Sequence, residues 1–126
     1  MRLLLDTHAF LWWLQDAPQL SATARDAVAD PGSLVFVSAA SIWEIAIKRS
    51  LGRIDSGEAD LVAEIEANDF VELPIAARHA EAAGSLPRHH EDPFDRMLVA
   101  QARLEGLTCV TRDGAFGAYD VATLWS

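Results

Sequence analysis

Short apolar runs alternate along the chain with longer segments whose apolar residues recur at helical spacing. The short runs are of strand length and predict five strands, the last of them short, at residues 2–5, 34–37, 70–73, 107–111 and 121–124. The segments between them predict six helices, at residues 7–15, 21–30, 39–50, 58–68, 75–83 and 93–105. This alternation predicts an α/β domain with a largely parallel sheet.

Residues that begin or end helices lie at the edges of several of these segments. Ser21 is placed to cap the second predicted helix. Gly84 and Gly106 are expected to end the fifth and sixth helices, because glycine readily adopts the left-handed conformation found after helix ends. A loop over residues 85–92 is expected between those two helices.

The first predicted helix is apolar on every side from Ala9 to Leu14, so a single buried stripe cannot accommodate it. Either this helix lies deep in a three-layer core, or part of it forms a subunit interface. The second alternative predicts a homodimer that uses Trp12 or Trp13. The sequence leaves both alternatives open.

The composition is that of one domain that occupies residues 1–126. With 126 residues, of which 51% are hydrophobic, the chain can fill one core and is too short for two ordinary domains. No apolar run approaches the ~18 to 20 residues needed to cross a bilayer. The first five residues briefly resemble a signal peptide, but Asp6 and His8 interrupt them and no cleavage site follows. We therefore expect a soluble, unprocessed protein without membrane contact.

The only cysteine, Cys109, lies in an apolar segment and is expected to be a buried thiol in a strand. One cysteine cannot form an internal disulfide. This cysteine usage fits a reducing compartment, and we expect a cytoplasmic location.

The net charge of −9 is unusual for a protein that binds nucleic acid through a broad basic face. Setting aside four carboxylates that we assign below to a metal site still leaves −5. Any contact with nucleic acid is therefore expected to be local, mediated by a metal, or helped by a partner.

Several acidic residues have an ordinary structural explanation when each is taken alone. Asp6 follows a strand and can cap the next helix, and Asp113 stands in an Asp-Gly turn. Glu44 lies three residues after Ser41, which is the spacing of a capping box. Such roles need no ligand.

Two further acids begin the last predicted helix. Asp92, followed by Pro93, has the pattern of an N-cap, and Asp95 stands in the first turn, where an acid interacts favourably with the helix dipole. Their spacing lets the two acids share a helix face. The residues alone do not decide which of them faces a site.

Topology brings four acids to one edge of the predicted sheet. In an open parallel sheet, the carboxyl ends of strands and the amino ends of the following helices share an edge, where ligands usually bind. Four acids are expected there: Asp6, Glu44, Asp95 and Asp113. Clustered carboxylates repel one another unless a cation intervenes, and oxygen ligands select Mg²⁺ or Mn²⁺. A cage of this kind is suited to phosphodiester hydrolysis.

Other catalytic motifs are missing from the sequence. It has no glycine-rich phosphate loop, no Cys/His cluster at zinc spacing, and no serine or cysteine nucleophile with a placed base. The adjacent side chains of His89 and His90 must diverge; they are expected on the loop surface, with a place near the substrate as the alternative. His8 is expected to be packed or exposed rather than part of the site.

Four segments, spread over nearly the whole chain, carry a family resemblance. They are residues 4–12 (LLDTHAFLW), 38–45 (SAASIWEI), 92–102 (DPFDRMLVAQA) and 110–113 (VTRD). Taken together and in this order, they resemble the PIN-domain family, and more narrowly the VapC-type toxins of bacterial toxin–antitoxin pairs. The resemblance implies a three-layer α/β/α sandwich around a parallel sheet of strand order 3-2-1-4-5.

The same resemblance implies a function. It implies a Mg²⁺- or Mn²⁺-dependent endoribonuclease that is toxic when free and is inhibited by a cognate antitoxin protein. It also implies a homodimer, and a toxin–antitoxin complex that binds its own promoter DNA through the antitoxin.

Carried over to this chain, the resemblance assigns roles to the acids. Asp6 and Asp95 correspond to direct metal ligands, and Asp113 to a third ligand or to one that acts through water. Glu44 would bind a second ion or orient the attacking water. Because the family pattern favours Asp95, Asp92 is expected to serve as the N-cap.

Residues beside the acids are candidates for supporting roles. Thr7 and Thr111 offer hydroxyls that can hydrogen-bond the acids or a metal-bound water. Arg96 and Arg112 are candidate substrate contacts, with ordinary surface or salt-bridge roles as the alternative.

Two other functions compete with a ribonuclease. One is another Mg²⁺-dependent phosphohydrolase; such enzymes commonly place adjacent acids or an Asp-x-Asp pair at the first strand, whereas here Thr7 and His8 follow Asp6. The other is a PIN-like binding module without activity, against which the four intact acids argue.

Overall fold

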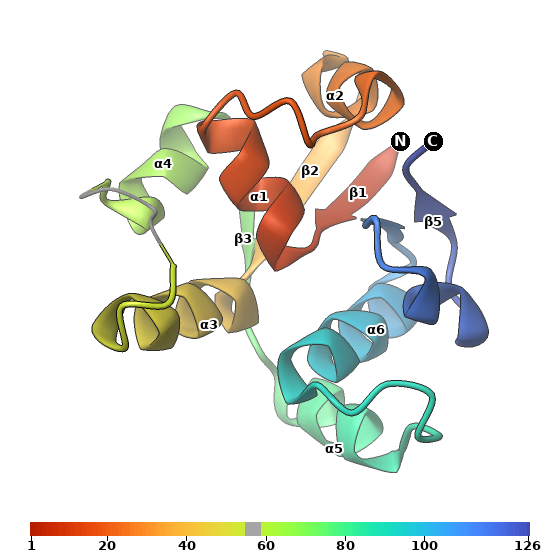
Figure 1. The fold of residues 1–126 in the computed structure, drawn as a ribbon. Helices are drawn as coiled ribbons and strands as arrows, with labels where there is room; N and C mark the ends of the chain where they lie inside the picture. The colour runs from red at the N-terminus through yellow and green to blue at the C-terminus, as the bar shows by residue number, and fades with distance from the viewer. Residues whose placement is uncertain (55–58) are drawn as a thin grey trace.

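The computed structural model describes residues 1–54 and 59–126. These residues contain a five-stranded sheet in the order β3-β2-β1-β4-β5, and every neighbouring pair of strands is parallel (Figure 1). The strands are β1 (Arg2–Leu5), β2 (Leu34–Ser38), β3 (Val71–Leu73), β4 (Thr108–Val110) and β5 (Thr123–Leu124). The order of the strands confirms the topology that the resemblance implies.

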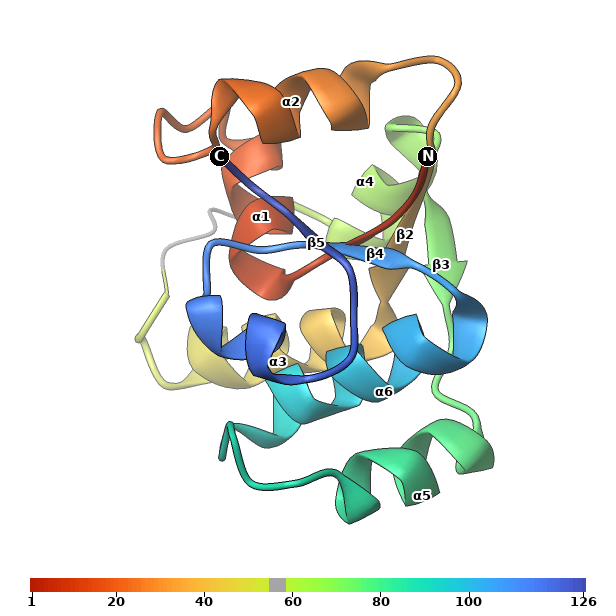
Figure 2. The same ribbon diagram turned by 90° about the vertical axis from the view of Figure 1, so that its right-hand side faces the viewer.

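Helices cover both faces of this sheet. They are α1 (Thr7–Leu14), α2 (Ala22–Ala29), α3 (Ala39–Ser50), α4 (Leu61–Ala67), α5 (Ala77–Ser85) and α6 (Pro93–Glu105), with a short 3₁₀-helix, η1 (Gly114–Ala118). Helices α1, α2 and α4 lie on one face and α5 and α6 on the other, whereas α3 extends from the end of β2 (Figures 1 and 2). The predicted three-layer α/β/α sandwich is therefore confirmed.

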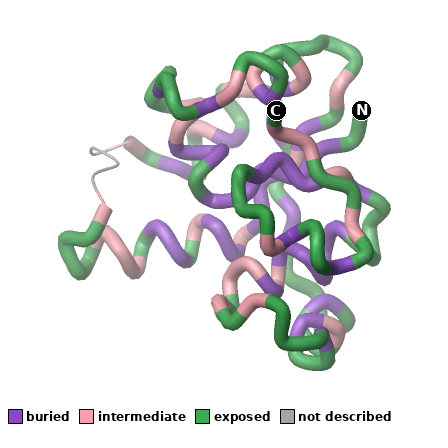
Figure 3. The backbone as a smooth tube through the Cα atoms, turned by 45° about the vertical axis from the view of Figure 1, so that its right-hand side comes forward, coloured by how far each residue is buried: buried purple, intermediate pink, exposed green. Residues whose placement is uncertain are grey.

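The alternation of side chains along β1 divides the core in two. Leu3 and Leu5 pack with residues of α1, α2 and α4, while Leu4 packs with residues of α5 and α6. All three leucines are fully buried, because a central parallel strand has helices on both sides. In Figure 3 the buried positions run through the middle of the molecule and the exposed ones lie on outer loops and helix faces.

The aromatic residues of α1 find partners within the chain. Trp12 packs against Trp125, with ring centroids 5.9 Å apart, and Trp13 packs against Phe70 at 5.9 Å. The Trp13 indole N–H also donates to Asn68 Oδ1 at 3.0 Å. These contacts account for the apolar character of α1 inside one protomer, in line with the first of the two alternatives.

Every predicted strand and helix is found, with ends that shift by a few residues. Gly106 ends α6 with a φ of 67°, as expected. The expectation that Gly84 ends its helix is wrong: α5 continues through Gly84 to Ser85. Helix α4 begins at Leu61, and its predicted start at residue 58 lies outside the described residues. The 3₁₀-helix η1 was not expected.

None of the described helices combines the length and the apolar character that a membrane span requires. Cys109 is buried in β4, and burial is the main reason that its pKa rises to about 12. The prediction of a buried thiol is confirmed.

Candidate functional site

Asp6 follows β1 at the carboxyl edge of the sheet and caps α1. Its carboxylate accepts a hydrogen bond from the Ala9 N–H at 2.7 Å and another from the Thr111 hydroxyl. Thr111 follows β4, the strand beside β1, and its Oγ1 accepts the N–H of Asp113 at 3.0 Å. A single threonine therefore connects the acids that follow two neighbouring strands.

Glu44 enters the same region from α3. The cap of this helix is Ser38, so the capping-box interpretation of Glu44 with Ser41 is wrong. Instead, Glu44 Oε1 accepts the Thr7 hydroxyl at 2.6 Å, and Oε2 lies 2.5 Å from Lys48 Nζ. Glu44 is 4% exposed. Its two oxygens are thus held between the start of α1 and the next turn of α3.

The two acids at the start of α6 have different surroundings. Asp92 Oδ1 accepts the N–H groups of Phe94 and Asp95, at 2.8 and 3.2 Å, which is the geometry of an N-cap. Asp95 makes no such cap and instead approaches His90. The structure therefore agrees with the assignment of Asp92 as the cap and leaves Asp95 free to face the other acids.

His90 lies among the acids rather than on the loop surface. Its Nε2 is 3.0 Å from Asp95 Oδ2 and 2.9 Å from Asp113 Oδ2. Its Nδ1 accepts the Asp92 N–H at 3.1 Å. The surface expectation is wrong for this histidine. A usable signal was present in the sequence, because the His-His pair lies just two residues before a helix whose amino end faces the carboxyl edge of the sheet.

Arg96 holds the loop that carries His90. The guanidinium is buried and donates to four backbone carbonyls, those of Ala83, Leu86, Pro87 and His90, at 2.8 to 3.2 Å. The suggestion that Arg96 contacts substrate is therefore wrong, because all of these bonds are internal. Tyr119 supports the same loop by accepting the His90 N–H and donating to the Pro87 carbonyl.

The acids at the carboxyl edge of the sheet differ in burial, and their pKa values change in opposite directions. Burial is the main cause that raises the pKa of Asp6, and the charge of Asp113 adds to it, although hydrogen bonds such as that from Thr111 oppose the change. At the more exposed Asp113, the smaller effect of burial is outweighed by hydrogen bonds from Ala115 and His90, so its pKa is lowered. Asp113 is therefore readily ionised, whereas the buried Asp6 resists ionisation.

The pKa of Asp95 is strongly raised. Burial raises its pKa to about 7, and the charges of Asp92, Glu44 and Asp6 add to this, against a lowering effect of His90. Asp95 thus interacts electrostatically with Glu44 and Asp6, and Asp6 in turn with Asp113. An ion with two positive charges would relieve their repulsion.

The donor atoms present fit a divalent cation. His90, Asp95 and Asp113 each offer one ligand atom, and these atoms lie within 4.8 Å of one another. In this structure His90 Nε2 lies within hydrogen-bond distance of both carboxylates, at 3.0 Å from Asp95 and 2.9 Å from Asp113, and so holds them at one place. The site could thus hold an ion with mainly oxygen ligands.

A small cavity opens beside these acids. It has a volume of about 250 Å³ and is lined by Asp6, His8, Trp12, Arg112 and Asp113. The Arg112 guanidinium lies 4.6 Å from the centre of the Trp12 ring, and the His8 ring stacks on Trp12 at 5.4 Å. His8 is exposed, as expected, but it faces this cavity.

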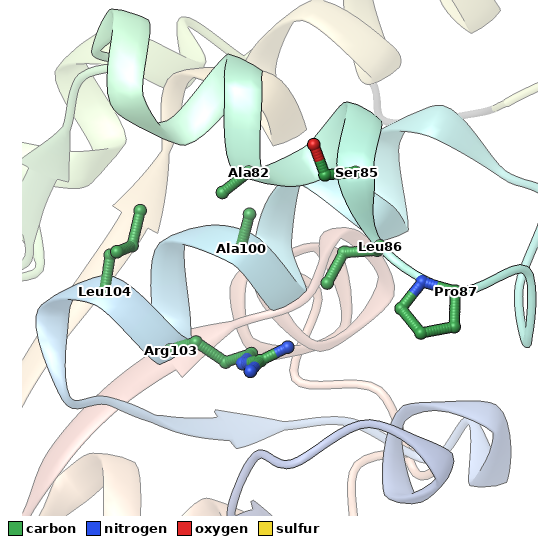
Figure 4. A pocket seen from close by; sticks show the side chains of 7 residues that line it. All are labelled: Ala82, Ser85, Leu86, Pro87, Ala100, Arg103 and Leu104. Atoms are coloured by element: carbon green, nitrogen blue, oxygen red, sulfur yellow. The ribbon is translucent and has the colours of Figure 1, made fainter.

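A second cavity, of about 270 Å³, lies between α5 and the carboxyl-terminal half of α6 (Figure 4). Its walls come from Ala82, Ala100, Leu104 and neighbouring residues, with Arg103 as the charged group. None of the acids described above lines it. This cavity is therefore separate from the candidate site.

A family profile matches the sequence of this chain, and solved structures resemble its fold. The PIN domain profile matches residues 3–122. None of the curated proteins matches the sequence. Among solved structures, the chain is similar to VapBC2 from Rickettsia felis bound to a DNA fragment from its promoter, with a TM-score of 0.74, 15% identity and 100% of both chains covered.

Two further structures share the fold at low sequence identity. FitAcB from Neisseria gonorrhoeae is 22% identical, with a TM-score of 0.63 and 97% and 96% of the two chains covered. A toxin–antitoxin complex from Klebsiella pneumoniae is 18% identical, with a TM-score of 0.63 and 96% and 94% covered. Since the profile spans nearly the whole chain and the fold agrees, this protein belongs to the PIN domain family.

Proposed function

We propose that this protein is a metal-dependent endoribonuclease and the toxin of a type II toxin–antitoxin pair. The observation that carries the proposal is the meeting of Asp6, Glu44, Asp95 and Asp113 at the carboxyl edge of a PIN-family sheet. Lys48 pairs with Glu44, and His90 with Asp95 and Asp113, but Asp6 is buried with hydrogen bonds and no ion pair among the described residues, so a bound cation would stabilise this group of acids. The substrate is RNA, and the bonds hydrolysed are its phosphodiesters.

In this proposal Asp6, Asp95 and Asp113 hold Mg²⁺ or Mn²⁺. When bound, the ion neutralises charge on the phosphate and lowers the pKa of a bound water. The Thr111 hydroxyl fixes the relative positions of Asp6 and Asp113, because it donates to the Asp6 carboxylate and accepts the Asp113 N–H. Glu44, fixed by Thr7 and Lys48, orients the attacking water or contributes to a second ion.

The proposed partners are a cognate antitoxin and a second copy of this chain. Similar structures are toxin–antitoxin complexes, one of them bound to promoter DNA, which supports an antitoxin. With a net charge of −9, this chain is expected to reach promoter DNA only through that antitoxin. We propose that it acts in the cytoplasm.

An exposed apolar surface supports the proposed homodimer. Trp43 of α3 is 61% exposed and packs edge-on against Phe94 of α6, with ring centroids 5.2 Å apart. Ile75 is 39% exposed and borders the same apolar cavity of about 180 Å³. Exposed aromatic and aliphatic side chains gathered at one place are typical of protein interfaces.

The decisive experiment compares RNA cleavage with and without the ion. Purified protein is incubated with structured and unstructured RNA in Mg²⁺ or Mn²⁺, then with a chelator. Cleavage is expected to require the ion and to be lost in Asp6→Asn. Asp26→Asn, at an exposed acid on α2, removes the same charge away from the site and is expected to keep full activity.

Other outcomes separate the competing functions. Cleavage that persists in chelator or in Asp6→Asn contradicts the metal-nuclease proposal. Hydrolysis of small phosphomonoesters in place of RNA would indicate the phosphohydrolase. Tight binding of a partner without any hydrolysis would indicate the binding module.

A further inference from the structure

The residues that line the cavity beside the acids are of two chemical kinds. Asp6 and Asp113, two of the proposed metal ligands, contribute carboxylates. His8, Trp12 and Arg112 contribute planar groups, which we call the planar wall. Anything that occupies this space therefore lies next to the proposed reaction centre and against flat side chains.

The planar wall is held in place from behind. Trp12 is partly buried and packs against Trp125. The guanidinium of Arg112 lies over the Trp12 ring at 4.6 Å, and the His8 ring lies nearly parallel to it, with 25° between the planes. The exposed groups are thus supported by a ring that the core fixes.

Arg112 is also available for a ligand. In the described part of the chain, no carboxylate lies within ion-pair distance of its guanidinium, although Asp113 is the next residue. A guanidinium plane can stack on a nucleobase and can bind a phosphate oxygen. In a chain with a net charge of −9, this is a local positive group of the kind that contact with RNA requires.

We infer that the cavity walled by His8, Trp12 and Arg112 is a nucleobase subsite, which takes an unpaired base beside the scissile phosphate of single-stranded RNA. The inference rests on the proposed ribonuclease function and adds that the RNA is single-stranded at the site of cleavage. A base inside a duplex is stacked on both sides and its face cannot reach this wall, whereas an unpaired base can stack on arginine or aromatic side chains. A small phosphomonoester would leave the planar wall without a partner.

The test measures stacking directly, without relying on cleavage. Binding is measured in the Asp95→Asn background, because Asp95 does not line the cavity, with a short single-stranded RNA that contains the fluorescent base 2-aminopurine. Binding is expected to quench the fluorescence. Arg112→Lys keeps the positive charge and removes the planar guanidinium, and His8→Ala removes the planar imidazole. Trp12 is left intact because it packs on the core.

Arg112→Lys is expected to weaken binding of single-stranded RNA about 5- to 100-fold and to reduce the quenching. Binding of duplex RNA is expected to be unchanged in the same variant. Arg103→Lys, in the cavity of Figure 4, is the matched control and is expected to bind like its parent. Circular dichroism checks that each variant is folded.

Unchanged affinity and quenching in both Arg112→Lys and His8→Ala would overturn the inference. Equal losses for single-stranded and duplex RNA, or an equal loss in Arg103→Lys, would overturn it as well. The proposed function fails separately: if stacking depends on Arg112 but the unmodified chain cuts no RNA with Mg²⁺ or Mn²⁺, the subsite stands without the nuclease. If metal-dependent cleavage occurs and stacking is absent, the nuclease stands without the subsite.

Discussion

At the scale of single residues, the start of α6 shows how position within one helical turn separates two identical side chains. Asp92 precedes the helix, so its carboxylate turns back to the free N–H groups of Phe94 and Asp95. Asp95 stands in the first turn and its carboxylate points to His90 and the other acids. One acid therefore stabilises the helix, and the other contributes negative charge to the site.

This difference predicts opposite outcomes for matched substitutions. Asp95→Asn is expected to weaken Mn²⁺ binding by at least about 100-fold, because even residues that only support metal ligands contribute 10- to 100-fold. Asp92→Asn is expected to keep metal binding and stability, since asparagine is an equally good N-cap. Calorimetric titration with Mn²⁺ measures both. Loss of binding in Asp92→Asn with binding intact in Asp95→Asn would reverse the assignment.

The raised pKa of Asp95 predicts how stability depends on pH when no metal is bound. In the unfolded chain this carboxyl ionises near its ordinary value of 3.8, whereas in the folded protein it ionises at about 7. Between these values the folded state holds a proton that the unfolded state lacks, so raising the pH through this window lowers the free energy of unfolding.

Urea unfolding in chelator at pH 5 and at pH 7.5 measures this effect. The parent protein is expected to lose more stability over this interval than Asp95→Asn, in which the group cannot ionise. Excess Mg²⁺ is expected to reduce the loss, because the ion favours the charged carboxylate. The same pH dependence in both proteins would show that Asp95 does not titrate in this range.

At the scale of elements, the sequence predicts the site residues that directly follow strands better than the site residues that lie on loops. The positions of Asp6 and Asp113 after strands β1 and β4 follow from a parallel sheet, so their meeting could be predicted. The place of His90 was not predicted, because it depends on hydrogen bonds of Arg96 to backbone carbonyls of the preceding loop and helix. Patterns of apolar residues carry no information about such bonds.

The same reasoning explains which helix ends were predicted. Gly106 ends α6 because the chain turns there with a left-handed residue. Gly84 stays within α5, since a glycine permits a helix end without requiring one. The 3₁₀-helix η1 is a single short turn after Asp113, too short for a periodic pattern.

The role of Arg96 as the anchor of the loop predicts a large structural effect. Arg96→Met keeps the length of the side chain but leaves four carbonyls without their donor, and is expected to lower the free energy of unfolding by about 2–4 kcal/mol. Hydrogen exchange at the His90 N–H, which donates to Tyr119, is expected to accelerate.

Arg103→Met, at an exposed arginine two turns further along α6, is the control and is expected to change stability by less than about 0.5 kcal/mol. Similar effects of the two substitutions would mean that the carbonyl bonds of Arg96 do not hold the loop.

At the scale of the whole molecule, the acidic edge and the apolar surface share two helices, α3 and α6. Glu44 and Trp43 are consecutive in α3, and Asp95 and Phe94 are consecutive in α6. In each pair one residue belongs to the proposed site and the other to the exposed aromatic contact. A second protomer bound at Trp43 would therefore place its own surface close to the acids.

If Trp43 lies in a dimer interface, its substitution is expected to lower the mass of the particle in solution. The unmodified chain is expected to scatter light as a dimer of twice 13.7 kDa, and Trp43→Ser as a monomer. Leu104→Ser, which removes another exposed apolar side chain that lies outside this surface, is expected to remain dimeric. A parent protein of monomeric mass at micromolar concentration would contradict the homodimer.

The burial of Cys109 has a practical consequence for measuring such assemblies. At pH 7 a thiol with a pKa of about 12 stays protonated and therefore unreactive, and this one is also shielded from solvent. A cysteine introduced at exposed Leu51, at the end of α3, would therefore accept a maleimide dye while the native thiol stays unmodified. Distances between protomers, or between toxin and RNA, become accessible to fluorescence energy transfer without first altering the core.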